Sequence, residues 1–156
     1  MIFMNALYKM SPKLLDKLQR LLASLRRAKK SYEQVAQMLK DRQLQHMVIG
    51  LALESTQYAH ELDSYVKTLG VATEQQQVAT EGNEQKSAEK KEWGSEEKDI
   101  INWCAKSEKY ILQVYRDLLN EPFLYEGVRK MLRYQLNGLL HSFSQLKLLR
   151  AALRTA

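Results

Sequence analysis

Apolar side chains recur at steps of three and four residues in the first half of this chain, the spacing of an amphipathic α-helix. Ser11 and Pro12 precede the first stripe and suit a helix start, because serine caps the first turn and proline needs no N–H there. Asp41 caps a second stripe, and Gly70 suits the position after its end. The pattern predicts helices over residues 12–40 and 42–69, antiparallel because their connection is short. The stripes contain Leu14, Leu18, Leu21, Leu25, Ala28, Tyr32, Val35 and Leu39, then Leu44, Val48, Leu51, Ser55, Tyr58, Leu62, Tyr65 and Leu69.

Two further stripes of the same spacing occupy the second half of the chain. Ser95 is the expected cap of the third helix, and Pro122 separates the third helix from the fourth, because proline cannot continue a helical hydrogen-bond ladder. The pattern predicts helices over residues 96–120 and 122–153. The stripes contain Ile100, Cys104, Ser107, Ile111, Val114 and Leu118, then Val128, Leu132, Leu136, Leu139, Phe143, Leu146 and Leu153.

Residues 71–94 lack this periodicity. Gln, Glu, Thr, Ala and Lys dominate there, and Trp93 is the one large apolar side chain. We interpret the segment as a long polar crossover between the second and third helices. No extended alternation typical of strands competes with the helices. The expected fold class is therefore all-α, an up-down-up-down four-helix bundle that forms a single domain over residues 1–156.

Composition also predicts the cellular compartment of the protein. A chain of 156 residues suits one domain. Its single cysteine, Cys104, excludes a framework of disulfides within the chain and favours a reducing setting. Met1 to Met10 do not resemble a signal peptide, and no apolar stretch is long enough to cross a bilayer. We expect a cytoplasmic protein without membrane insertion.

The net charge of +6 is unevenly distributed. Residues 12–40 carry eight Lys and Arg, including the cluster Arg26, Arg27, Lys29 and Lys30. Such a surface could attract nucleic acid or an anionic membrane. The preferred interpretation is a solvated helix face, and nucleic acid ranks last among the expected partners because no aromatic residues interleave with the cluster for base stacking.

Helical bundles often build metal sites from inward carboxylates, and the di-iron type uses Glu-x-x-His pairs. This chain has no such pair, since Gln43, Gln57 and Gly138 lie three residues before its histidines, His46, His60 and His141. A standard di-iron centre is not expected. A looser set at the edges of the stripes remains a candidate metal site, with iron or manganese as the expected ion. The set contains Glu33, Glu54, Glu61, Glu108 and His141.

The alternative for these carboxylates is that they bond tyrosines or an arginine, or reach water. Cys104 has no neighbour in sequence that would activate it, so a buried structural thiol is the preferred interpretation. No phosphate-binding glycine motif occurs. The absence of a catalytic signature favours a protein that is not an enzyme.

Several short motifs together resemble a known family. They are Tyr32-Glu33, Glu54-Ser55-x-x-Tyr58-x-x-Glu61-Leu62, Cys104-x-x-x-Glu108, Tyr115-x-x-Leu118, and Gln135 and His141 before Leu148-Leu149-Arg150. The chain resembles a bacterial ferritin-like four-helix-bundle family of unknown function. The resemblance implies a ferritin-like bundle and a bacterial origin, and it supplies no activity.

Three functions stay open on these grounds. The first is a non-catalytic binding or association module, whose partner is another protein or a second copy of the chain. The second is a metal-binding carboxylate bundle related to iron, manganese or oxidative stress. The third is binding of nucleic acid by the basic surface.

Overall fold

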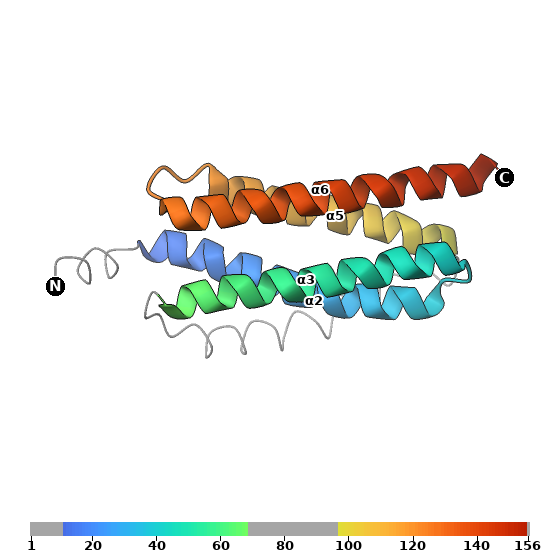
Figure 1. Ribbon diagram of the computed structural model, residues 1–156, viewed down its shortest axis with the longest axis horizontal. Coiled ribbons are helices and arrows are strands. Elements are labelled where there is room, and N and C mark those ends of the chain that lie inside the picture. Colours follow the sequence, from blue (N-terminus) through green and yellow to red (C-terminus); the bar gives the residue numbers. More distant parts are fainter. Residues whose placement is uncertain (1–10, 69–96, 156) are drawn as a thin grey trace.

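Four long helices make up the part of the protein that the computed structural model describes, residues 11–68 and 97–155 (Figure 1). They are α2 (Pro12–Met38), α3 (Arg42–Thr68), α5 (Glu97–Leu119) and α6 (Glu126–Thr155). No strand occurs in these two ranges, so the all-α prediction is confirmed for them. The predicted crossover, with Gly70 and Trp93, lies outside the described residues.

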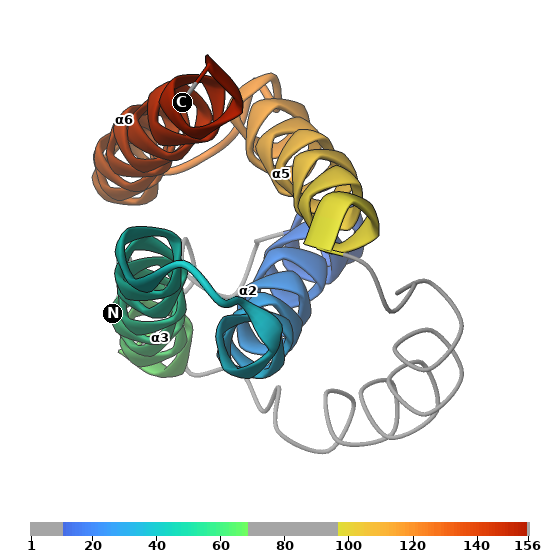
Figure 2. The same cartoon turned by 90° about the vertical axis from the view of Figure 1, so that its right-hand side faces the viewer.

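The helices occupy the four corners of a bundle (Figure 2). Helix α2 contacts α3 and α5, and α6 contacts the same two, so α2 lies diagonally across from α6 and α3 across from α5. The short connections join α2 to α3 and α5 to α6, as the pattern predicted.

Contacts between helices give their directions. Early in α2, Lys17 pairs with Glu121 just beyond the end of α5, whereas Tyr32, late in α2, packs edge-on against Trp103 near the start of α5. Helices α2 and α5 are therefore antiparallel. Because α2 and α3 are also antiparallel, α3 and α5 run in the same direction (Figure 1).

The order of the helices is thus up-down-down-up, and the predicted up-down-up-down order is wrong. Helical periodicity is the same in both directions along a helix, so it assigns buried faces but no direction. A tight connection forces antiparallel neighbours only within each of the two hairpins. Side-chain contacts between the two hairpins determine their relative direction, and the stripes did not predict these contacts.

The core lies along the axis of the bundle and contains most of the predicted stripe positions. Each helix contributes leucines, isoleucines or valines that are almost completely buried. The stripe on α6 ends sooner than predicted, because Leu153 is partly exposed while Leu146 is buried. Among the described residues, no helix combines the length and apolar character that crossing a bilayer requires. The largest fully buried side chains are Tyr32, Tyr115, Leu18, Leu21, Leu22, Leu25, Leu51, Leu62, Ile100, Leu118, Leu132 and Leu139.

The connection between α2 and α3 is held by local polar bonds. Helix α2 ends at Met38, two residues before the predicted boundary, because Leu39 is extended (φ −82°, ψ 138°). The Asp41 carboxylate accepts a hydrogen bond of 2.9 Å from the Leu44 N–H and so caps α3 as predicted. The Gln45 amide donates to the Ala36 carbonyl at 2.8 Å and ties the two helices together.

Helix α6 begins at Glu126, four residues later than predicted. The residues before it form a turn in which Leu124 is buried. The Arg129 guanidinium donates to the carbonyls of Leu119 and Glu121 at 2.7 and 2.8 Å. These bonds satisfy carbonyl groups at the end of α5 that have no partner within their helix. The turn before Glu126 therefore terminates α5 and is not the first turn of α6.

Asp41→Ala should lower the free energy of unfolding by about 1 kcal/mol, because the Leu44 N–H loses its cap. Urea denaturation followed by circular dichroism measures the change. Asp41→Ser is the matched control, since a serine hydroxyl can replace the carboxylate as acceptor. Equal losses of unfolding free energy in both variants would show that the helix cap does not contribute to stability at this position.

Candidate functional site

A fully buried amide joins three helices in the middle of the bundle. The Gln135 side chain on α6 is 0% exposed, and its Oε1 accepts a hydrogen bond of 2.8 Å from the Tyr115 hydroxyl of α5. Its Nε2 lies 3.2 Å from the Tyr58 carbonyl and 3.1 Å from Glu61 Oε1, both on α3, and donates to them. These bonds use both hydrogens and one lone pair of the amide, which offsets its desolvation.

A second group of bonds lies nearer the surface between α3 and α6. Glu54 Oε2 accepts from the Tyr58 hydroxyl at 2.7 Å, and Glu54 Oε1 accepts from the Ser142 hydroxyl at 2.6 Å. Gly138 on α6 faces this group, and a Cβ atom there would collide with the Tyr58 hydroxyl. We call the residues of both groups the polar layer. They are Glu54, Tyr58, Glu61, Tyr115, Gln135 and Ser142.

Burial keeps the phenols of the polar layer protonated. Desolvation raises the pKa of Tyr115 well above its usual value, and the nearby Tyr58, Glu54 and Glu61 raise it further. The pKa of Tyr58 is raised first by desolvation and then by its hydrogen bond to Glu54. A phenol held neutral in this way is a hydrogen-bond donor and does not serve as a general base near pH 7.

Glu108 on α5 is a buried carboxyl outside the polar layer. It is 8% exposed, and its Oε1 has no hydrogen-bond partner. Burial raises its pKa to about 7, an effect that the positive charges of Arg150 and Lys147 partly oppose. The carboxyl is therefore about half protonated at neutral pH.

Cys104 lies one turn before Glu108 and is buried, as predicted. Burial, and then the charge of Glu108, raise the pKa of the thiol to about 12. A thiol that stays protonated at neutral pH is a weak nucleophile. The Tyr32 phenol is also buried, and its pKa is raised first by desolvation and then by the charges of Cys104 and Glu108.

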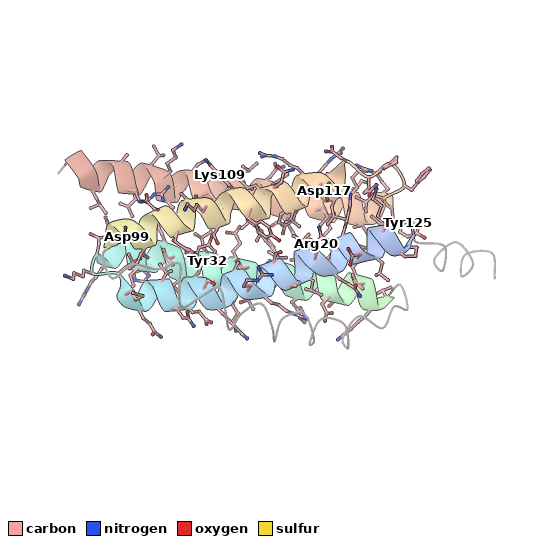
Figure 3. All side chains as sticks on the ribbon, turned by 180° about the vertical axis from the view of Figure 1, so that it is seen from behind. Arg20, Tyr32, Asp99, Lys109, Asp117 and Tyr125 are labelled. Carbon is pink, nitrogen blue, oxygen red and sulfur yellow. The ribbon has the colours of Figure 1, made fainter. Side chains whose placement is uncertain are left out.

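A hollow lies on the surface between α2 and α5. It encloses about 170 Å³ and is lined by Lys17, Arg20, Tyr110, Gln113, Val114 and Asp117. Figure 3 shows Arg20 and Asp117 on these neighbouring helices. Lys17 is 2.8 Å from Glu121 and 3.3 Å from Asp117, and Arg20 is 3.4 Å from Asp16. The positive charges are thus balanced by local acids, so the hollow does not attract an anion strongly.

The interior contains a much smaller cavity at the other end of the bundle. Its volume is about 10 Å³, which is near the minimum needed for one water molecule. The cavity is too small for an organic substrate. Its walls come from all four helices and are mostly aliphatic. They are formed by Val35, Leu39, Leu44, Val48, Ile100, Cys104, Leu146 and Arg150.

The structure does not bring the five predicted metal ligands together. Glu33 is exposed and lies 3.9 Å from Lys29, and His141 is exposed on α6. Glu54 and Glu61 are two turns apart on α3, about 10 Å along the axis. Within residues 11–68 and 97–155, no group of three or more His, Cys, Asp or Glu side chains could hold a metal ion.

The polar layer matches the alternative expected for the carboxylates, since Glu54 bonds a tyrosine. Both oxygens of Glu54 and of Glu61 accept hydrogen bonds, those of Glu61 coming from Gln135 and Gln57. Within the two described ranges, neither carboxylate has the two further His, Cys, Asp or Glu side chains that would complete a metal site. The role of Ser142 was missed, although its position seven residues after Gln135 places it on the same face of α6.

The fold is a four-helix bundle, and side chains of the polar layer form hydrogen bonds to one another across its helices. Residues 13–121, more than half of the chain, match the family model described as Domain of unknown function (DUF2383), and the chain belongs to that family. The expectation of a family without an assigned function is confirmed. No curated protein matches the chain.

Gln135→Leu should lower the free energy of unfolding by about 1–3 kcal/mol, because it leaves the buried Tyr115 hydroxyl and Glu61 without this partner. Adding Tyr115→Phe should recover part of that loss, since the hydroxyl left unpaired is removed as well. A double-mutant cycle in urea measures the coupling. Additive losses would contradict the bond across α5 and α6.

Glu108 should make the protein less stable as the pH rises. Its pKa is about 7 in the folded chain against an ordinary value of 4.5, so the folded state binds the proton more tightly. The free energy of unfolding should therefore fall between these two pH values and stay low above them. Glu108→Gln should remove this slope and be more stable than the wild type above pH 7 by about 1–3 kcal/mol.

The exposed Glu33 provides the matched control for this measurement. Glu33→Gln should keep the pH dependence of the wild type in urea unfolding. A Glu108→Gln variant with the wild-type slope would show that the buried carboxyl is not responsible for it.

Proposed function

We propose that this chain is a ferritin-like helical bundle that acts as a non-catalytic binding or association module. The observation that carries the proposal is the polar layer, in which buried polar groups satisfy one another and hold α3, α5 and α6 together. The up-down-down-up order supports the ferritin-like class, because such folds place one long crossover between two antiparallel hairpins.

The chemistry of the interior also favours this proposal. Binding and catalytic sites are usually concave pockets of several hundred Å³ with a few converging polar groups. The interior cavity here is about 10 Å³, and the polar layer does not line it. The phenols and the thiol remain protonated at neutral pH, so they do not supply a base or a nucleophile. The proposal therefore places contacts with partners at the surface of this part of the chain.

One observation favours the second candidate, a metal-binding bundle. Glu108 Oε1 is buried and accepts no hydrogen bond, which is costly unless the carboxyl is protonated or binds a cation. The raised pKa of Glu108 favours the protonated carboxyl, which lowers the cost of burial without a metal ion. The non-catalytic module therefore remains the preferred function.

Nucleic-acid binding has less support. Arg26 lies 3.7 Å from Asp63, and Lys29 lies 3.9 Å from Glu33, so part of the basic stretch is matched by acids of the same bundle. A surface that binds phosphates by charge needs cations beyond those that its own acids balance.

A metal measurement separates the first two functions. Purified protein is incubated with Fe²⁺ or Mn²⁺, desalted, and analysed for bound metal. The proposal predicts well below one ion per chain, because the described residues bring no three His, Cys, Asp or Glu side chains together to hold one. One ion per chain that Glu108→Gln loses and the exposed control Glu33→Gln keeps would contradict it.

A further inference from the structure

The outward face of α3 carries no formal charge over about six turns. Between residues 43 and 64, none of the exposed positions of this helix is Asp, Glu, Lys or Arg. Two exposed aliphatic side chains lie one turn apart on it, Ile49 at 42% and Leu53 at 67% exposure. We call these exposed positions the α3 face. They are Gln43, His46, Ile49, Gly50, Leu53, Thr56, Gln57, His60 and Ser64.

The outward faces of α2 and α5 differ from the α3 face. The exposed residues of α2 include Lys13, Asp16, Arg20, Lys30 and Glu33. Those of α5 include Asp99, Lys106, Lys109, Arg116 and Asp117, and α5 lies diagonally across the bundle from α3 (Figures 2 and 3). Exposed charge is thus denser on α2 and α5 than on the α3 face. Uncharged surfaces with exposed aliphatic residues are typical of protein contacts.

Gly50 lies in the middle of the α3 face, and the packing among the described residues does not account for it. Glycine in a helix interior is less favourable than alanine. A Cβ atom at Gly50 would meet nothing within 4 Å, whereas one at Gly127 or Gly138 on α6 would collide with a tyrosine hydroxyl of α3. The two glycines on α6 therefore make room for α3. A glycine on the outer surface of a helix leaves room for the close approach of another backbone.

We propose that the α3 face binds the same face of a second copy of this chain, so that the protein forms a symmetric dimer. The proposal rests on the proposed function and names its partner. Two copies with a net charge of +6 each repel one another, and the α3 face is a place where they can meet without bringing like charges together. A strongly charged partner would find no complementary charge on this face.

The sequence of the α3 face suits a twofold axis. In a symmetric contact of two antiparallel helices centred on Leu53, this residue meets its own equivalent. Positions at equal distances on either side of Leu53 then face one another, so Gly50 lies opposite Thr56 and Ile49 opposite Gln57. The small Gly50 leaves a groove next to the large Leu53. When two helices pack, a ridge of side chains on one helix fits into such a groove on the other.

The area of the contact requires neighbouring side chains as well. A helix face about 33 Å long and about 10 Å wide offers roughly 300–400 Å², whereas stable interfaces bury about 800 Å² on each partner. Tyr134 on the adjoining α6 is 66% exposed and packs edge-on against Tyr58 of α3. The exposed residues that follow it on α6, Asn137 and His141, are also without formal charge. They extend the uncharged surface towards the required area.

Sedimentation equilibrium of the full chain over a wide concentration range tests the proposal. The wild type should reach twice the 18.2 kDa mass of one chain. Leu53→Glu should raise the dissociation constant of the dimer about tenfold or more, because it brings two carboxylates together at the centre of the contact. Gly50→Phe should do the same by filling the space beside Leu53, and the open surroundings of Gly50 let this variant fold. Tyr110→Glu on α5 is the control and should leave the dimer intact.

Three results would overturn the dimer. They are a wild type that stays at the mass of one chain, a dimer that survives both Leu53→Glu and Gly50→Phe, and equal loss of the dimer in Tyr110→Glu. Circular dichroism of each variant shows that it is folded. A failure here leaves the association module standing with a different protein as partner, whereas failure of the proposed function appears separately as stoichiometric metal.

Discussion

The hydrogen bonds of the buried Gln135 amide constrain the arrangement of three helices at once. An amide completely removed from water is costly unless its donors and acceptor are paired. Here the partners come from Tyr115 on α5 and from the Tyr58 carbonyl and Glu61 on α3. Apolar packing alone tolerates small shifts of one helix along another, whereas these bonds fit one register. The polar layer therefore adds specificity to the stability that the leucine core provides.

Two carboxylate environments, one half-buried and one buried, show why similar residues have different roles. Glu54 and Glu61 lie at the edge of the α3–α6 contact, and both oxygens of each accept hydrogen bonds. Glu108 lies deeper, with an oxygen that no donor reaches, and it holds its proton up to about pH 7. Burial in a site without donors favours the protonated form of a carboxyl. Neither environment gathers several carboxylates around one point.

The periodicity of apolar residues predicted the helices and most of their buried positions, because the apolar side of an amphipathic helix is removed from water. Leu18, Leu62 and Leu132 are examples that the structure buries almost completely. Relations between helices were not predictable in the same way. The spacing of Glu54, Glu61 and Glu108 places each on a face of its own helix, but it does not give the register of one helix against the next. The direction of α5 relative to α3 was missed for the same reason, and so was the bond from Ser142 to Glu54.

The account requires that the interior around Gln135 stays closed and that contacts with other molecules are made outside it, as on the α3 face. Native-state hydrogen exchange of the backbone amides near Tyr58, Tyr115 and Gln135 tests this requirement most directly. These amides should exchange only through global unfolding, with equal opening free energies on α3, α5 and α6. Exchange of one of the three helices through a local opening of much lower free energy would contradict it.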